Sequence, residues 1–234
     1  MQPVCSVTLD LDGTLVDTVG DLRAGCNGML AELGEPLRSE AEIRRFVGKG
    51  MANLVERCLT RAGEAAPDQA RIAAGIAAFR RHYHAVNGQS SLIYPGVTAG
   101  LDAMQAAGWP LACVTNKPAM FTGPLLEKLG LAKYFQVVVS GDTLPQKKPH
   151  PEPLRFACAQ MGVPLSGNVH IGDSGNDIAA ARAAGCAVIC VPYGYNEGEP
   201  VDSADCDALV SDLVAAVAWL RDRPASSDTA CKTS

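Results

Sequence analysis

The sequence predicts an α/β protein with a doubly wound parallel sheet and an α-helical insert after the first strand. Short apolar runs alternate with single helical patterns over the second half of the chain, which indicates βαβ units. Polar or acidic loops follow several of these runs directly, as at the carboxyl edge of a parallel sheet. A stretch of about seventy residues without a strand-like run interrupts the alternation after the first strand.

The expected elements follow from the periodicity of the apolar residues. Short apolar runs predict strands at residues 4–9, 110–114, 135–140, 168–172 and 186–191. Helical patterns lie between and after them, at residues 97–107, 118–129, 151–161, 175–184 and 212–221. In the interrupting stretch, helical patterns at residues 19–33, 40–47, 51–62 and 67–86 are separated by Gly and Pro. On the first of these helices, Asp21 and Arg23 are expected to face the solvent.

The composition is that of an ordinary globular protein. The chain has 234 residues, of which 47% are apolar and 19% charged, and this is enough to bury a core without a disulfide or a structural metal. The net charge of −5 argues against nucleic acid or an anionic membrane as a partner, but it leaves room for a small anionic ligand. The sequence has neither a basic signal segment nor a run of about 18 apolar residues, so we expect a soluble, cytoplasmic protein.

The cysteines indicate a reducing compartment. Nine are present, the number is odd, and no C-x-x-C motif occurs. Several lie inside apolar runs, as Cys113 does. We therefore expect buried thiols and no disulfide framework.

Two aspartates, Asp10 and Asp12, follow the first predicted strand in the segment D-L-D-G-T-L-V-D-T. If the backbone stays extended there, both carboxylates project in the same direction. Two like charges beside a buried strand are unfavourable unless a cation is shared, and Mg²⁺ is a hard ion that prefers oxygen ligands. The alternative interpretation is a cluster of turn and N-cap residues.

Further polar residues follow the later strands. Thr115 and Asn116 follow the second, Lys147 and Lys148 lie in the loop after the third, and G-D-S-G-N-D at residues 172–177 follows the fourth and opens a helix. Ligands of open parallel sheets bind beyond the carboxyl ends of the strands, so we expect these groups to meet the first aspartates. Helix N-termini and lysines favour phosphate, and phosphate with Mg²⁺ and a nucleophilic carboxylate describes phosphoryl transfer.

In this order, the motifs D-x-D-G-T-L-x-D-T, T-N, K-P and G-D-S-x-N-D resemble those of the haloacid dehalogenase superfamily of phosphohydrolases. The resemblance extends from about residue 4 to residue 220 and implies a Rossmann-like sheet with strand order 3-2-1-4-5. It implies a catalytic core at residues 1–17 and 91–234 and a small α-helical cap domain at residues 18–90. Segments 114–118, 147–153 and 193–196 resemble the bacterial phosphoglycolate phosphatase branch.

The resemblance also implies a role for each matched acidic residue. Asp10 matches the nucleophile that becomes an aspartyl-phosphate, and Asp12 matches the general acid that protonates the leaving group and then activates water. Asp10, the backbone carbonyl of Asp12 and Asp173 match the Mg²⁺ ligands, while Asp177 matches a residue that contacts the ion indirectly. We expect the carboxylates of Asp10, Asp12 and Asp173 to converge on one site.

The remaining matches concern the substrate. Thr115 and the backbone of Asn116 match phosphate-binding groups, and Lys148 matches the lysine that neutralises the nucleophile and the phosphoryl oxygens. In the cap, Arg44 and Lys49 lie beside a glycine turn, where they either face a substrate carboxylate or form a solvated basic face. The expected substrate is a small anionic phosphate ester, 2-phosphoglycolate in the first place or a sugar phosphate such as N-acetylmuramate 6-phosphate. We expect a monomer or a homodimer.

Other chemistries are compatible with parts of the pattern. A dehalogenase does not need the second acid, Asp12, and a phosphonate hydrolase would use a cap lysine such as Lys49. A phosphomutase would differ mainly in how its cap excludes water. A phosphoacceptor signalling module shares the acidic residues, the hydroxyl and the lysine, but it is shorter, carries its phosphorylated Asp after a later strand and lacks a helical insert. His170, inside a predicted strand, is expected to be a hydrogen-bonded core histidine.

Overall fold

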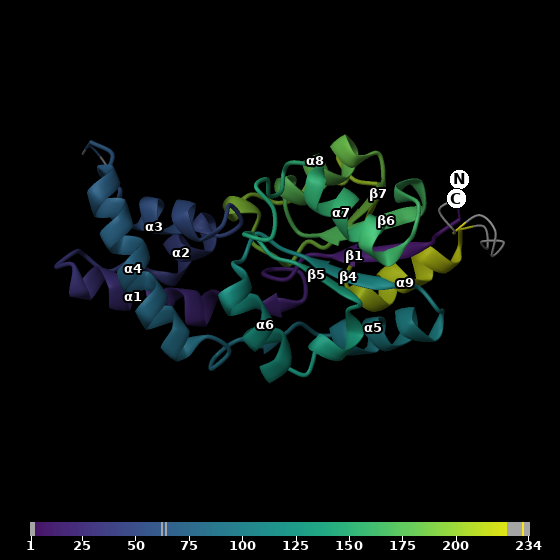
Figure 1. The fold of residues 1–234 in the computed structure, drawn as a ribbon, viewed down its shortest axis with the longest axis horizontal. Coiled ribbons are helices and arrows are strands. Elements are labelled where there is room, and N and C mark those ends of the chain that lie inside the picture. The colour runs from purple at the N-terminus through teal and green to yellow at the C-terminus, as the bar shows by residue number, and fades with distance from the viewer. Residues whose placement is uncertain (1–2, 62, 64, 224–230, 232–234) are drawn as a thin grey trace.

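A six-stranded parallel sheet forms the centre of the protein in the computed structural model, which describes residues 3–61, 63, 65–223 and 231. Its strands stand in the order β5-β4-β1-β6-β7-β8 (Figure 1). The five strands expected from the sequence thus stand in the order 3-2-1-4-5, and β8 adds an edge strand. The strands are β1 (Ser6–Leu9), β4 (Leu111–Val114), β5 (Val137–Val139), β6 (Asn168–Gly172), β7 (Ala187–Cys190) and β8 (Ala208–Leu209).

Helices cover both faces of the sheet (Figure 1). On one face, α5 (Val97–Ala106), α6 (Ala119–Lys128) and α9 (Leu213–Arg221) share a core with the odd-numbered residues of β1, β4 and β6. On the other face lie α7 (Glu152–Met161) and α8 (Gly175–Ala184). The alternation of side chains along a strand explains these two cores. Three short 3₁₀ turns complete this part of the chain, η1 (Ala132–Tyr134), η2 (Leu165–Gly167) and η3 (Asn196–Gly198).

Four helices that follow β1 form a cap beside the sheet (Figure 1). These are α1 (Val19–Glu32), α2 (Glu40–Phe46), α3 (Met51–Leu59) and α4 (Gln69–Val86), and they pack around an apolar cluster of their own. A two-stranded antiparallel ribbon of β2 (Val16–Asp17) and β3 (Leu92–Ile93) lies where the chain leaves the core and returns to it. No helix in the described part of the chain is long and apolar enough to cross a membrane.

One cap residue contradicts the expectation of a solvated side chain. Asp21 is 1% exposed and accepts hydrogen bonds from the backbone N–H groups of Gly88 (2.8 Å), Ser90 (2.7 Å) and Ser91 (3.1 Å). The carboxylate therefore satisfies the backbone donors of the segment through which the chain returns to the core. Arg23, by contrast, is exposed and pairs with Glu40 at 3.4 Å.

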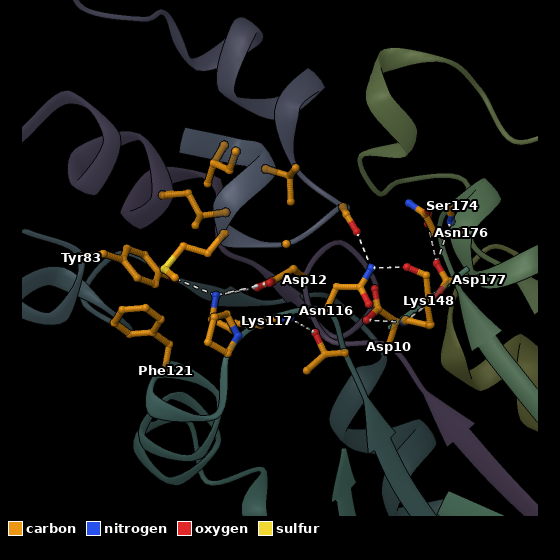
Figure 2. A pocket seen from close by; sticks show the side chains of 18 of the residues that line it. Asp10, Asp12, Tyr83, Asn116, Lys117, Phe121, Lys148, Ser174, Asn176 and Asp177 are labelled. Atoms are coloured by element: carbon orange, nitrogen blue, oxygen red, sulfur yellow. Dashed lines mark hydrogen bonds and ion pairs between the residues drawn. The ribbon is translucent and has the colours of Figure 1, made fainter. Parts of the chain in front are cut away.

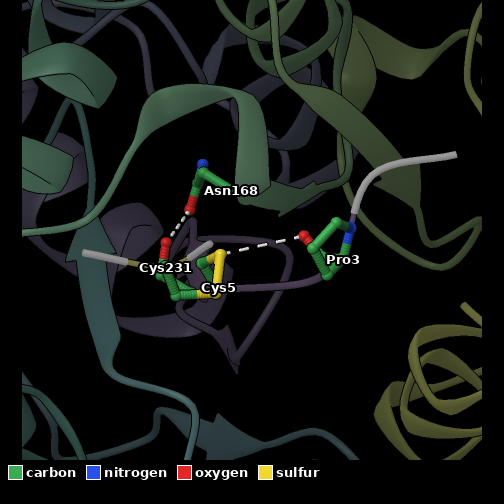
Figure 3. Close-up of a disulfide and its surroundings, with 5 residues drawn as sticks. Pro3, Cys5, Asn168 and Cys231 are labelled. Carbon is green, nitrogen blue, oxygen red and sulfur yellow. Dashed lines mark hydrogen bonds between the residues drawn. A yellow bond between two sulfur atoms is a disulfide. The ribbon is translucent and has the colours of Figure 1, made fainter. Parts of the chain in front are cut away.

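The cysteines differ from the sequence-based expectation at one pair. Cys5 and Cys231, 226 residues apart, form a disulfide (Figure 3). Cysteine spacing could not indicate this pair, because the pair depends on Cys231 lying beside Cys5 in the folded protein. The other seven cysteines are buried free thiols, as expected.

Candidate active site

A pocket lies where the carboxyl ends of β1, β4 and β6 face the cap. The core contributes Asp10 and Asp12 after β1, residues 115–118 after β4, and residues 174, 176 and 177 after β6. Lys148 reaches the same pocket from the loop after β5 (Figure 2). The polar segments that follow separate strands in the sequence are thus brought together at one edge of the sheet.

Three buried carboxylates form the acidic end of this site. One oxygen each of Asp10, Asp173 and Asp177 lies within 4.8 Å of the other two. Asp173 accepts a hydrogen bond from Thr14 Oγ1 (2.9 Å) and another from the backbone N–H of Tyr195 (2.7 Å). Burial raises the pKa of Asp173, and it raises the pKa of Asp10 to about 7 although Lys148 opposes the shift. Because such a cluster is costly without a counter-charge, its oxygen donors fit a hard divalent cation.

Lys148 supplies part of that counter-charge. Its Nζ lies 2.7 Å from Asp10 Oδ1 and 2.7 Å from Asp177 Oδ1, and the residue is 2% exposed. Burial lowers the pKa of Lys148, but the attraction of Asp10 and Asp177 outweighs burial and leaves the pKa above its usual range. The adjacent Lys147 is exposed, so the structure places Lys148 at the site.

Asp177 is fixed by the start of α8 and by the core histidine. Its Oδ2 accepts hydrogen bonds from the Ser174 backbone N–H (3.1 Å) and Oγ (2.6 Å), and His170 Nε2 lies 3.0 Å from its Oδ1. Burial raises the pKa of Asp177, but Lys148 and His170 outweigh burial and hold the pKa below its usual range. His170 is fully buried and also contacts Thr8 Oγ1 at 3.0 Å, which confirms the expected hydrogen-bonded core histidine.

The side chain of Asp12 does not join the acidic cluster, contrary to the expected convergence of the three carboxylates. Its Oδ1 lies 3.1 Å from Lys117 Nζ and accepts a hydrogen bond from Thr18 Oγ1 at 2.8 Å. The reason is that β1 ends at Leu9. Strand alternation therefore does not extend to Asp12, and its carboxylate lies on the cap side of the pocket (Figure 2).

Lys117 is a site residue that the sequence analysis missed. It is 5% exposed, lines the pocket, and donates a hydrogen bond from Nζ to the hydroxyl of Tyr83 in cap helix α4 at 2.7 Å. Burial lowers the pKa of Lys117, but Asp12 and Tyr83 outweigh burial and raise the pKa above its usual range. Its position directly after Thr115 and Asn116 was the available signal in the sequence.

Thr115 and Asn116 lie at the pocket wall after β4. Thr115 Oγ1 accepts a hydrogen bond from the Lys117 backbone N–H (3.2 Å). The amide of Asn116 donates from Nδ2 to the carbonyl of Gly48 in the cap (2.8 Å) and to the carbonyl of Lys148 (2.9 Å). The Asn116 side chain thus connects the cap turn with the loop that carries the site lysine.

The two cap cations singled out in the sequence, Arg44 and Lys49, lie outside the pocket. Arg44 pairs with Asp17 at 3.2 Å, and its guanidinium lies over the ring of Tyr195, 5.0 Å from the ring centroid. Lys49 pairs with Glu197 at 2.6 Å. Neither side chain lines the pocket, because acidic partners on the core side hold both of them at the junction of cap and core.

Comparison with known proteins agrees with this architecture. Residues 7–191 match the family model described as haloacid dehalogenase-like hydrolase. The chain is 48% identical over 214 residues to a phosphoglycolate phosphatase of Thiobacillus denitrificans, an alignment that covers 92% of this chain and 94% of the relative.

Two solved structures extend the comparison. A crystal structure described as a predicted phosphoglycolate phosphatase from Haemophilus somnus matches with a TM-score of 0.87 and 32% identity, covering 94% of this chain and 99% of that one. CbbY from Rhodobacter sphaeroides in complex with phosphate matches with a TM-score of 0.76 and 27% identity, covering 90% and 95% of the two chains. The chain belongs to the haloacid dehalogenase-like hydrolases and is a phosphoric monoester hydrolase of that family.

Proposed function

We propose that this phosphatase is Mg²⁺-dependent and hydrolyses 2-phosphoglycolate to glycolate and phosphate through an aspartyl-phosphate on Asp10. The observation that carries the proposal is the position of Asp10. Its carboxylate lies at the pocket, 2.7 Å from a buried lysine and beside two further carboxylates that can share a cation with it. A nucleophilic carboxylate needs this neutralising environment to approach a phosphate ester, which is itself an anion.

The proposed reaction uses the two sides of the pocket in sequence. An Asp10 oxygen attacks phosphorus, the bond from phosphorus to the ester oxygen breaks, and Asp12 gives its proton to that oxygen. Asp12 then takes a proton from water, whose oxygen attacks phosphorus and releases phosphate and the Asp10 carboxylate. Asp12 is suited to both steps because its side chain lies apart from the acidic cluster, on the cap side where the leaving group exits.

Residues on the core side of the pocket would bind the phosphoryl group and the metal ion. Lys148 would hold Asp10 and the phosphoryl oxygens, with Thr115 and the Asn116 backbone at the same wall. Asp10, the Asp12 carbonyl and Asp173 would hold Mg²⁺, with Asp177 contacting it indirectly. When bound, Mg²⁺ supplies positive charge against the charge that spreads over the transition state.

Support for the substrate comes from relatives and from the shape of the site. The Thiobacillus denitrificans relative is described as a phosphoglycolate phosphatase. In this chain, apolar cap side chains including Leu54 and Phe79 line the pocket, which favours a small leaving group over a bulky one.

The test is phosphate release from a panel of esters with and without Mg²⁺, using Asp10→Asn as the control. The panel contains 2-phosphoglycolate, N-acetylmuramate 6-phosphate, hexose phosphates and nucleoside monophosphates. We expect Mg²⁺-dependent turnover, strongest on 2-phosphoglycolate and lost in Asp10→Asn. Faster turnover of a sugar phosphate would overturn the substrate and keep the mechanism, whereas Mg²⁺-independent turnover would overturn the mechanism.

A further inference from the structure

We propose that Lys117 and Tyr83 together bind the carboxylate of the leaving group, and that this pair makes the enzyme selective for phosphate esters with an anionic leaving group. This inference rests on the proposed function, because it assigns the part of the same pocket that receives the leaving group. Lys117 thus takes the role of the cation that recognises the substrate carboxylate. The sequence analysis considered Arg44 and Lys49 for this role, but both lie outside the pocket.

The arrangement of the pocket gives the first argument. Asp10 and Lys148 lie at one end, Lys117 and Tyr83 lie at the other, and Asp12 lies between them (Figure 2). A leaving oxygen protonated by Asp12 directs the rest of the leaving group away from Asp10. In a two-carbon leaving group such as glycolate, the carboxylate then falls on the side of Lys117.

The distribution of charge gives the second argument. Among the described residues that line the pocket, the cations are Lys117 and Lys148. Lys148 is held between Asp10 and Asp177. Within the residues that the structure describes, Lys117 has a single acidic partner, Asp12, and is therefore the ammonium group with fewer acidic neighbours. Apolar side chains, among them Leu22, Leu54 and Phe121, line the same pocket and weaken competition from water.

The hydroxyl of Tyr83 gives the third argument. It accepts the hydrogen bond from Lys117, and in the described part of the chain no acceptor bonds to its own proton. A buried tyrosine hydroxyl normally has a partner for that proton. The ring is fixed by stacking on Phe79, with centroids 5.0 Å apart, and by an edge contact with Phe121 at 4.8 Å.

The charged ammonium group of Lys117 and the O–H group of Tyr83 therefore stand side by side at the end of the pocket that faces the leaving group. This pair matches the two oxygens of a carboxylate, and charge-assisted hydrogen bonds of this kind are the stronger ones in proteins. An ester without the carboxylate would leave the buried Tyr83 O–H group without an acceptor and Lys117 with Asp12 as its anionic partner. Such a mismatch typically costs a factor of about 10² or more in kcat/KM.

The experiment compares two nearly isosteric esters, 2-phosphoglycolate and its neutral amide, carbamoylmethyl phosphate. We expect the wild-type enzyme to prefer the first by about 10²-fold in kcat/KM. Tyr83→Phe, which removes only the hydroxyl, and Lys117→Met should each reduce this preference by about tenfold or more, while Lys117→Arg keeps most of it. Lys147→Met is the matched control, because it removes a neighbouring exposed lysine and should leave the preference unchanged.

A purely positioning role of Lys117 through Asp12 gives a different result. Loss of such a role would slow both esters by the same factor and leave their ratio unchanged, and this outcome would overturn the inference. Equal wild-type turnover of both esters would also overturn it, while the phosphatase activity itself would stand.

A binding measurement keeps the inference testable even if the proposed function fails. The Asp10→Asn enzyme is titrated calorimetrically with 2-phosphoglycolate, with and without the additional Tyr83→Phe change. We expect the second change to raise Kd by about tenfold, and to have little effect on the Kd of inorganic phosphate. An unchanged Kd for 2-phosphoglycolate would show that the carboxylate lies elsewhere.

Discussion

The side-chain amide of Asn116 donates a hydrogen bond across the junction of cap and core to the carbonyl of Gly48, 2.8 Å away. The same nitrogen also donates to the carbonyl of Lys148. One side chain from the carboxyl end of β4 thus holds the cap turn and the loop of the site lysine together. The position of the cap turn is in this way tied to the part of the core that would bind phosphate.

Removal of this amide should loosen the cap turn. We expect Asn116→Ala to increase amide hydrogen exchange at residues 48–51 and to raise KM by about tenfold, because the partly buried Gly48 carbonyl loses its donor and the cap turn is held less firmly against the core. Hydrogen exchange followed by mass spectrometry would show the change. Glu197→Gln is a useful comparison, since it weakens the half-exposed pair with Lys49 and should have a smaller effect. Unchanged exchange at residues 48–51 in Asn116→Ala would contradict the prediction.

Metal binding should depend on pH because its ligands must lose protons. Burial, opposed by Lys148, raises the pKa of Asp10 to about 7, and burial also raises the pKa of Asp173. Below pH 7 the protonated carboxyl competes with the cation, so the apparent affinity for Mg²⁺ should fall as the pH falls, approaching tenfold per pH unit well below pH 7 for each carboxyl that must lose a proton. Well above pH 7 the dependence on Asp10 disappears.

Calorimetric titration with Mg²⁺ between pH 5.5 and 8.5 would measure this dependence. Proton release, obtained from buffers of different ionisation enthalpy, should approach at least one proton per Mg²⁺ at acidic pH. Asp10→Asn should bind Mg²⁺ more weakly throughout and with a shallower pH dependence. An affinity that is constant from pH 5.5 to 7 would remove Asp10 from the ligand set.

The buried carboxylate of Asp21 should stabilise the return of the chain from cap to core. Asp21→Ala leaves three backbone N–H groups without their acceptor, and we expect it to lower the free energy of unfolding by about 3 kcal/mol. Urea denaturation followed by circular dichroism would test this. Arg23→Ala, on the same helix but exposed, should change the free energy by less than about 0.5 kcal/mol. Equal effects of the two substitutions would mean that the Asp21 network contributes little.

The sheet could be predicted from the sequence because its strands are buried on both faces and appear as apolar runs between helical patterns. β1 and β6 lie where they were expected, and the acidic motifs directly follow them. The strands β2, β3 and β8 were missed because each has two residues, too few to show a period.

The missed parts of the site share a physical cause. Lys117 and Tyr83 are 34 residues apart, and the periodicity of α4 does not tell which of its side chains turns toward the core. Arg44 and Lys49 were correctly noted as cap cations, but their acidic partners come from loops whose positions depend on the tertiary fold. Such ion pairs form only when the cap packs against the core, and the local sequence around either residue does not indicate how the two pack.

The disulfide gives a prediction that concerns the thiols and the stability together. Alkylation of the denatured protein without reductant should modify the seven free cysteines, and prior reduction should add Cys5 and Cys231. Because the cross-link joins residues 226 apart, it restricts the unfolded chain, and its loss should lower the free energy of unfolding by about 2–4 kcal/mol. Cys5→Ser would give the same loss, whereas Cys26→Ser, at a buried free thiol, serves as the control for the substitution itself.

If reduction lowers the free energy of unfolding of the wild type and of Cys5→Ser equally, the effect does not come from the Cys5–Cys231 bond. The pair lies at the start of β1, whereas Asp10 follows the end of that strand. Stability should therefore change far more than kcat.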